Sequence, residues 1–266
     1  MNVLYGLLIA VSMYSKVPVP LVEWTKPRMR YAMCWFPVVG LVCGGLLWLW
    51  FCVSGSFGFH PGAAGLVGVC IPVLVTGGIH LDGFLDTLDA RSSYGNKEKK
   101  LEILKDPHTG AFAIIGSCVY FMLYAACLIQ LFIDGRQMGQ ERMVAAFCLV
   151  FSLERAFSGF SVASFRCAKN SGLVHTFSDG AHKQVTRIVL LLWMAVLFAM
   201  LTLTGWLPAA AVFGTGGAVF WYYWHMSKKE FGGITGDLAG WFLQIFELTA
   251  LAALMVCARW MAGQAG

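Results

Sequence analysis

Three aspartates lie close together in the stretch from His80 to Ala90, in a chain that otherwise contains few charged residues. Asp82, Asp86 and Asp89 have the spacing i, i+4, i+7, which places them within an arc of roughly 60° on one face of a helix. Carboxylates crowded in this way repel one another unless a cation joins them. Oxygen ligands of this kind suit Mg²⁺ or Mn²⁺, which proteins hold with a few carboxylates, water and substrate phosphate oxygens. We therefore predict a metal site at these aspartates; the alternative is a solvated acidic helix start.

The composition is typical of a helical membrane protein. Of the 266 residues, 58% are hydrophobic and only 12% are charged, whereas a soluble domain carries about 25% charged residues. Apolar stretches that suit spans of about 20 residues occur at 36–53, 62–79, 111–133, 144–163, 188–206, 208–226 and 238–258. We predict an all-α, polytopic helical membrane protein with about seven transmembrane helices, in a single domain over residues 1–266.

The first apolar stretch, from Val3 to Met13, is too short to span a membrane. It is followed by Lys16-Val17-Pro18-Val19-Pro20, which lacks the small-residue cleavage pattern of a signal peptide. We expect an N-terminal interfacial or re-entrant helix here.

The positions of the lysines and arginines support this topology, because these residues collect in cytoplasmic loops. With the N-terminus inside, the outer segments keep only Arg136, Arg142 and Arg259, and Arg155 lies within the fourth span. The net charge of +5 therefore reflects topology and gives no case for nucleic acid binding. We expect the active-site loops 80–110, 164–187 and 227–237 to face the cytoplasm. The inner segments hold 15 of the 19 lysines and arginines, namely Lys16, Lys26, Arg28, Arg30, Arg91, Lys97, Lys99, Lys100, Lys105, Arg166, Lys169, Lys183, Arg187, Lys228 and Lys229.

The polar loops contain residues that suit a phosphate site. Lys105, Asp106 and His108 lie in a turn with a proline and a glycine, and Lys or His donors would bind the phosphate oxygens that a metal does not reach. Arg166 and Lys169 belong to a second basic, glycine-containing loop that suits an anionic partner. The alternative for each is a solvated loop that follows the positive-inside rule.

Ionisable residues also lie within the predicted spans. Glu154 and Arg155 are in the fourth span, where a charge costs at least about 2.5 kcal/mol unless it is paired or faces a cavity. Two interpretations of Glu154 and Arg155 remain open: a functional role, or a local Glu–Arg pair that locks two helices together. Asp237 follows a glycine-rich stretch and is a candidate ligand or a helix N-cap. Glu247 lies inside the last span and is a candidate metal ligand or substrate contact.

Short motifs along almost the whole chain are similar to those of one enzyme family. The HLDG-x2-D-x2-D and GGxTGD blocks are specific in combination, and on these residues the chain resembles cobalamin synthase, the adenosylcobinamide-GDP ribazoletransferase family. The matching residues are Lys16-Val17-Pro18-Val19-Pro20, Phe36-Pro37-Val38-Val39-Gly40, Thr76 to Gly83, Asp86, Asp89, Asp106, Gly110, Arg155, Ala168-Lys169, Gly172-Leu173 and Gly232 to Asp237.

The resemblance implies that the chain joins α-ribazole or its 5′-phosphate to adenosylcobinamide-GDP and releases GMP. It also implies a Mg²⁺-dependent phosphotransferase of the EC 2.7.8 type, multi-pass in the lipid bilayer of the bacterial inner membrane; a homo-oligomer is a further expectation. Asp82, Asp86 and Asp89 would be both catalytic residues and metal ligands, with Asp89 as the first candidate base. The substrate would be bound by His80, Lys105, Asp106, His108, Arg155, Arg166, Lys169, Thr235, Asp237 and Glu247.

Two positions depart from the family's pattern. His108 stands where an arginine is usual, so a permanent cation is replaced by one that depends on pH. Gln244 stands where a glutamate is usual, three residues before Glu247, which puts a two-glutamate role for this helix in doubt.

Two other functions fit parts of the sequence. A CDP-alcohol phosphotransferase also binds metal at a membrane surface, but its later G-x3-D-x3-D block is absent here. A cation transporter would use intramembrane Glu154, Arg155 and Glu247, whereas most charges in this chain lie at one face.

Overall fold

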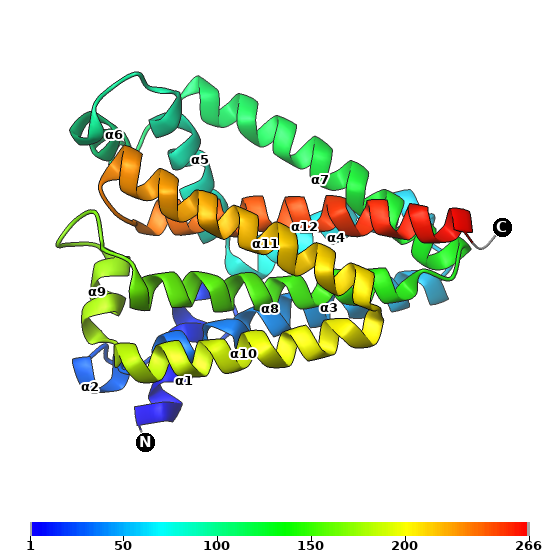
Figure 1. Ribbon diagram of the computed structural model, residues 1–266, viewed down its shortest axis with the longest axis horizontal. Coiled ribbons are helices and arrows are strands. Elements are labelled where there is room, and N and C mark those ends of the chain that lie inside the picture. The colour runs from blue at the N-terminus through cyan, green and yellow to red at the C-terminus, as the bar shows by residue number, and fades with distance from the viewer. Residues whose placement is uncertain (1, 265–266) are drawn as a thin grey trace.

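Long helices run side by side along the longest axis of the molecule and form a bundle (Figure 1). The computed structural model describes residues 2–264. Within them, five helical segments are long and apolar enough to cross a membrane, and the bent pair α4–α5 makes a sixth when it is counted as one span. The bundle helices are α3 (Phe36–Ser56), α4 (Pro61–Thr76), α7 (Ala111–Gln137), α8 (Glu141–Ser164), α10 (Lys183–Thr204), α11 (Trp206–Met226) and α12 (Gly236–Gln264).

These seven helices correspond to the seven predicted spans. The predicted stretch 208–226 forms α11, which runs along the bundle although it is not among the segments apolar enough to qualify as a span. Large apolar side chains cover the outside of the bundle. On α10, for example, Leu191, Leu192 and Val196 are exposed. An apolar surface of this extent matches lipid acyl chains, so the expected polytopic helical membrane protein is confirmed.

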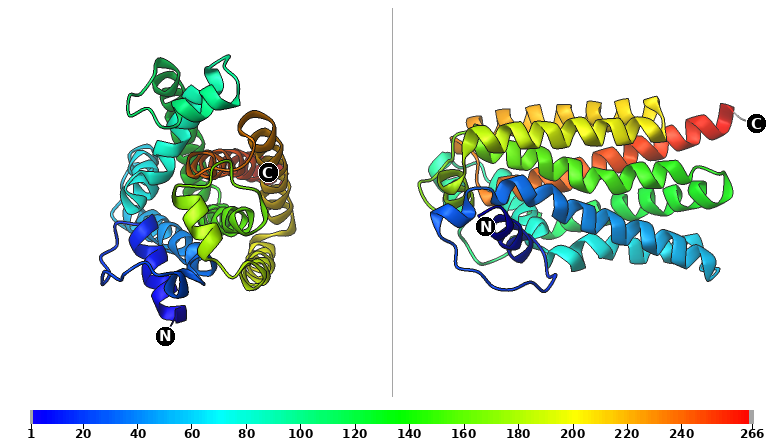
Figure 2. Two further views of the ribbon diagram at one scale, coloured as in Figure 1. Left: turned by 90° about the vertical axis from the view of Figure 1, so that its left-hand side faces the viewer. Right: turned by 90° about the horizontal axis from the view of Figure 1, so that it is seen from below.

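α8 is the central helix of the bundle. It packs against α3, α10 and α12, and Figure 2 shows other helices around it when the bundle is viewed end-on. Gly40 and Gly44 of α3 face it, and a Cβ at either position would clash with the backbone at Phe151 or Cys148. The pair forms the small-xxx-small pattern that lets two membrane helices approach closely.

The polar loops gather at one end of the bundle. The short elements there are α2 (Lys26–Met29), η1 (Ala32–Trp35), α6 (Lys97–Ile103), α9 (Leu173–Gly180) and η2 (Ser227–Phe231), at the left of Figure 1. The end of α12 and the α7–α8 and α10–α11 turns lie at the opposite end. The loops 80–110, 164–187 and 227–237 therefore share one end, as predicted. α1 (Asn2–Tyr14) is about 20 Å long, shorter than the roughly 30 Å hydrocarbon core, as expected for a helix that does not span.

The chain bends by 96° between α4 and α5 (Ile79–Ser92). Gly77 and Gly78 have φ angles of 65° and 78°, in the left-handed region that glycine adopts without steric cost. α4 therefore ends at Thr76, slightly before the predicted end of its span at residue 79. α5 turns away from the direction of the bundle and packs against α12 and α7. The helix predicted for the three aspartates is confirmed.

The contact of α3 with α8 gives a first prediction. Gly44→Ala should destabilise the protein by about 1–3 kcal/mol, because its Cβ overpacks the crossing. Gly45→Ala is a matched control, because no atom lies within 4 Å of its Cβ. Thermal unfolding of both variants in detergent would measure the difference. Equal melting temperatures would contradict the close crossing.

Candidate active site

The close crossing of α5 and α12 brings two distant parts of the sequence together. A Cβ at Gly83 would lie 2.7 Å from the Cα of Asp237, and a Cβ at Gly240 would lie 2.6 Å from the carbonyl oxygen of His80. Glycine is required at both positions because the two backbones are almost in contact. The start of α12 therefore lies against the turn of α5 that bears Asp82 and Asp86.

Asp82, Asp86 and Asp237 form a group of carboxylates at this crossing. Burial and repulsion from Asp82, Asp237 and Asp89 raise the pKa of Asp86 to about 6. Neither the Asp82 carboxylate nor the Asp86 carboxylate has a hydrogen-bond or ion-pair partner among the described residues. The sequence predicted Asp82 and Asp86 correctly as neighbours, and the structure adds Asp237 to them. The group therefore concentrates negative charge at the crossing.

Asp89 has a different environment from the other two aspartates of α5. Its Oδ2 accepts a hydrogen bond from Gly110 N at 2.6 Å, and its Oδ1 accepts one from Ala113 N at 2.8 Å. Both amides lie at the start of α7, where backbone N–H groups have no partner within the helix. Asp89 therefore caps α7, and its two oxygens are already engaged.

The donors at the crossing fit a hard divalent cation. Within residues 2–264, no three His, Cys, Asp or Glu side chains converge on one point as a closed metal site. Mg²⁺ does not require such a cage, because it is usually bound by one or two carboxylates, several waters and substrate phosphates. An all-oxygen group with uncompensated charge has the donor chemistry of that ion.

Basic and hydroxyl side chains surround this group. Lys169 lies close enough to Asp237 and Lys105 for their charges to act on it, and burial together with Lys105 lowers the pKa of Lys169. Thr235 Oγ1 accepts a hydrogen bond from Leu238 N at 3.2 Å, so Thr235 caps α12. Asp237 lies within the first turn of α12 and is not its N-cap, and its Oδ2 accepts a hydrogen bond from Thr235 Oγ1 at 3.3 Å.

A second polar cluster is buried inside the bundle. Arg155 Nη1 donates to Glu154 Oε1 at 2.5 Å and to the Phe151 carbonyl oxygen at 2.8 Å. Tyr124 O–H donates to Glu247 Oε2 at 3.5 Å. Glu154 lies ten residues before the end of α8, about 15 Å along the helix, so the cluster is near mid-membrane depth. Paired charges at this depth agree with the local Glu–Arg pair that the sequence left open.

This inner cluster surrounds a very small cavity. The cavity has about 10 Å³, enough for a single water molecule, and is lined by His80, Arg155, Gln244 and Glu247 among others. His80 is 6% exposed. The structure therefore separates His80, Arg155 and Glu247, three of the predicted substrate-binding residues, from the carboxylate group at the surface.

The remaining predicted residues lie at the surface. Asp106 accepts hydrogen bonds from His108 N at 2.9 Å and binds His108 Nδ1 at 2.7 Å. These bonds lower the pKa of Asp106, and the side chain of His108 is 89% exposed. The two residues stabilise their own turn. Arg166 is exposed and lines two open cavities beside the site.

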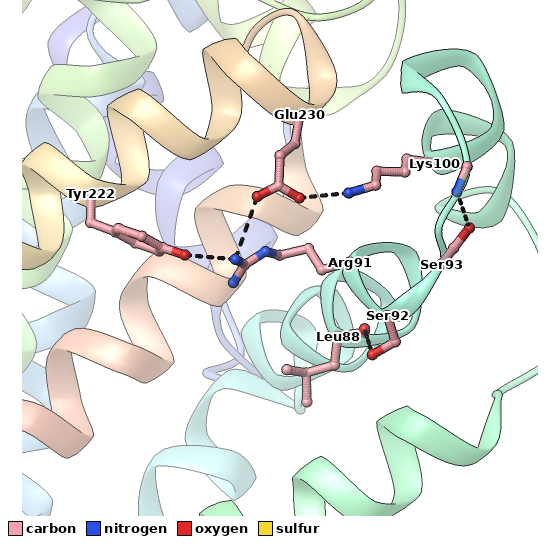
Figure 3. Close-up of polar contacts among 8 residues, drawn as sticks. Leu88, Arg91, Ser92, Ser93, Lys100, Tyr222 and Glu230 are labelled. Carbon is pink, nitrogen blue, oxygen red and sulfur yellow. Dashed lines mark hydrogen bonds and ion pairs between the residues drawn. The ribbon is translucent and has the colours of Figure 1, made fainter.

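Sequence reasoning missed a set of interactions that fixes α6 at the site (Figure 3). Glu230 accepts hydrogen bonds from Lys100 Nζ at 2.7 Å and Arg91 Nη2 at 3.4 Å, and Arg91 Nη2 also donates to Tyr222 Oη at 2.6 Å. Burial opposes the ionisation of Glu230, but Lys100 and Arg91 outweigh it and lower its pKa. No spacing pattern signals this set, because it joins α5, α6, α11 and η2.

Comparison with known proteins agrees with these motifs. A family model described as cobalamin-5-phosphate synthase matches residues 6–255. The chain belongs to this family. It is 42% identical over 258 residues to the adenosylcobinamide-GDP ribazoletransferase of Lachnoclostridium phytofermentans, covering 96% of this chain and 95% of that protein. It is 32% identical to the enzyme of that name from Clostridium perfringens strain 13 (92% and 94% covered) and 30% to that of Chlorobaculum parvum (98% and 97% covered). No solved structure matches.

The different environments of the aspartates give a second prediction. Asp89→Ala should lower the melting temperature by about 1–8 °C, because it removes the cap of α7. Asp82→Ala should leave the melting temperature unchanged or raise it, because the variant removes charge repulsion and does not remove a stabilising contact. Thermal unfolding in the same detergent would compare them. A lower melting temperature for Asp82→Ala alone would contradict the assignment.

Proposed function

We propose that this protein is an adenosylcobinamide-GDP ribazoletransferase that attaches α-ribazole, or its 5′-phosphate, to adenosylcobinamide-GDP and releases GMP. The observation that carries the proposal is the group Asp82, Asp86 and Asp237, formed by the two motifs that also place the chain in its family. This group lies beside Lys169, at the end of the bundle where the polar loops meet. Carboxylates and cations side by side suit a substrate that contains a diphosphate.

The reaction joins a ribose hydroxyl to a phosphorus atom. The hydroxyl oxygen attacks the phosphorus that is attached to cobinamide, a new P–O bond forms, and the P–O bond of the anhydride breaks so that GMP leaves with the electron pair. The hydroxyl proton passes to a carboxylate. Asp86 suits this role, because its carboxylate has no hydrogen-bond or ion-pair partner among the described residues and lies beside Asp82 and Asp237. Asp89, the first candidate from the sequence, is less suited because both its oxygens accept backbone hydrogen bonds.

Mg²⁺ is the proposed cofactor. One or two carboxylates of the group Asp82, Asp86 and Asp237 would hold it together with water and diphosphate oxygens, and when bound it would neutralise charge on the diphosphate and on the leaving GMP. Lys169 and Lys105 would bind phosphate oxygens outside the metal's reach. Lys169 has a lowered pKa, but it stays a cation at neutral pH when a diphosphate is near.

The site is proposed to face the cytoplasm from a bacterial inner membrane. The same end of the bundle bears the site and the loops with most of the lysines and arginines, and such loops remain on the cytoplasmic side. Adenosylcobinamide-GDP is bulky and charged, so access from the aqueous cytoplasm is consistent with this orientation.

Turnover is the direct test of the proposed activity. Purified protein supplied with adenosylcobinamide-GDP and α-ribazole should release GMP only with Mg²⁺, and Asp82→Asn and Asp237→Asn should each lose about 100-fold or more in kcat. Glu141→Gln is a matched control, because Glu141 begins α8 at the end of the bundle opposite the site and its loss should leave kcat unchanged. GMP and the cobalamin product would be followed by chromatography. Full turnover in Asp82→Asn, or in a chelator, would refute the assignment.

The orientation has its own test. Alkaline phosphatase fused after α12 should be active and a green fluorescent protein fused there should be dark, because the end of α12 lies opposite the site. At the other end, a fusion in the loop that precedes α6, after Gly95, should give an inactive phosphatase and a fluorescent green fluorescent protein. Fluorescence from the fusion after α12 would show that the protein has the opposite orientation to the one proposed.

A further inference from the structure

An open cavity of about 660 Å³ lies beside the carboxylate group, between α6, the end of α8 and η2. Apolar and aromatic side chains form its walls, including Leu101, Phe165, Trp224 and Phe231, and Arg166 and Lys228 add positive charge. Lys228 Nζ lies 5.4 Å from the centre of the Trp224 ring. A flat apolar wall with nearby cations is the environment that binds an aromatic base joined to a phosphate.

Two serines with unpartnered hydroxyls, Ser164 and Ser227, are among the residues that line the same cavity. Ser164 Oγ and Ser227 Oγ are buried and make no hydrogen bond within the described residues, and Ser227 is only 1% exposed. A buried polar atom without a partner is unfavourable, so both hydroxyls suit the polar edge of a ligand. Ser227 begins η2, a π-helical turn, and such turns occur frequently at functional sites.

The interactions in Figure 3 hold two walls of the cavity together. Lys100 is on α6, which supplies Leu101, and Glu230 is on η2, which supplies Ser227 and Phe231. The 2.7 Å bond between Lys100 and Glu230 therefore fixes the width of the cavity.

The cavity adjoins the proposed catalytic group. A smaller cavity of about 150 Å³ contains Lys169, Thr235 and Asp237, and Ile234 lines both cavities. Lys169 Nζ donates to the Leu101 carbonyl oxygen at 3.1 Å, so this lysine lies at the boundary between them. A nucleotide with its base in the larger cavity would place its phosphate beside Lys169 and Asp237.

We propose that the larger cavity binds the bicyclic base of a nucleotide, stacked on Trp224 and hydrogen-bonded by Ser164 and Ser227. This inference rests on the proposed function, which supplies two such bases: the guanine of the cobinamide nucleotide and the benzimidazole of α-ribazole. Both are flat heteroaromatic bases on a ribose, and the experiment distinguishes them.

The test measures equilibrium binding to the full-length protein in phosphatidylcholine nanodiscs by calorimetry. The ligands are GMP, α-ribazole 5′-phosphate and ribose 5-phosphate. Trp224→Ala should weaken binding of one of the two nucleotides about 10-fold or more and leave ribose 5-phosphate unchanged. Trp221→Ala, a matched control one turn earlier on α11 and outside the cavity, should have no effect. Ser227→Ala should weaken the same nucleotide about 2- to 10-fold without loss of stability, because its hydroxyl has no partner to lose.

Each outcome decides the inference. Loss of GMP affinity assigns the cavity to guanine, and loss of ribazole phosphate affinity assigns it to the acceptor base. Three results would overturn the inference. They are unchanged nucleotide affinities in Trp224→Ala, an equal loss of affinity for ribose 5-phosphate, and no nucleotide binding to the unsubstituted protein. Turnover of the unsubstituted protein is measured separately. Normal turnover with unchanged affinities would refute the cavity assignment alone, whereas specific nucleotide binding without turnover would refute only the proposed reaction.

Discussion

At the crossing of α5 and α12, two helices approach so closely that neither Gly83 nor Gly240 has space for a Cβ atom. The site depends on this contact, because it places Asp237 beside Asp82 and Asp86 although more than 150 residues separate them. Three carboxylates at such a contact repel one another, and burial together with this repulsion raises the pKa of Asp86. The protein thus concentrates negative charge at one place. A bound cation would balance this charge and would in turn bind a diphosphate.

The buried cluster below the site explains how charged residues persist inside an apolar bundle. Arg155 is fully buried and pairs with its neighbour Glu154 and with a main-chain oxygen of the same helix. Removing only one partner of such a pair is strongly destabilising, typically by about 3–5 kcal/mol. Because His80 lines the same small cavity and lies two residues before Asp82, the cluster supports the start of α5 from within. At this buried position the cluster supports the site and has no space to contact a large substrate.

The two ends of the bundle differ in structure and in composition. One end has long loops, short helices, cavities and most of the cations, whereas the other has short turns and an ion pair that joins α12 to α7, Arg259 with Asp134 at 3.2 Å. A helix bundle in lipid must satisfy its backbone hydrogen bonds internally, so irregular segments and polar chemistry collect where the chain leaves the membrane. The 96° bend at Gly77 and Gly78 is what places α5 across that end.

The sequence by itself determined the membrane class, the positions of the long helices, the clustering of the loops at one end and the helix that bears Asp82 and Asp86. These features follow from local composition and periodicity, which act within a few turns of chain. Only the tertiary structure decided that Asp89 caps α7, that Asp237 joins the other aspartates, that Arg155 and Glu247 lie in the core, and that Glu230 fixes α6. Each of these depends on which helix packs against which, because a side chain at a given position on a helix face finds its partner only when distant segments meet.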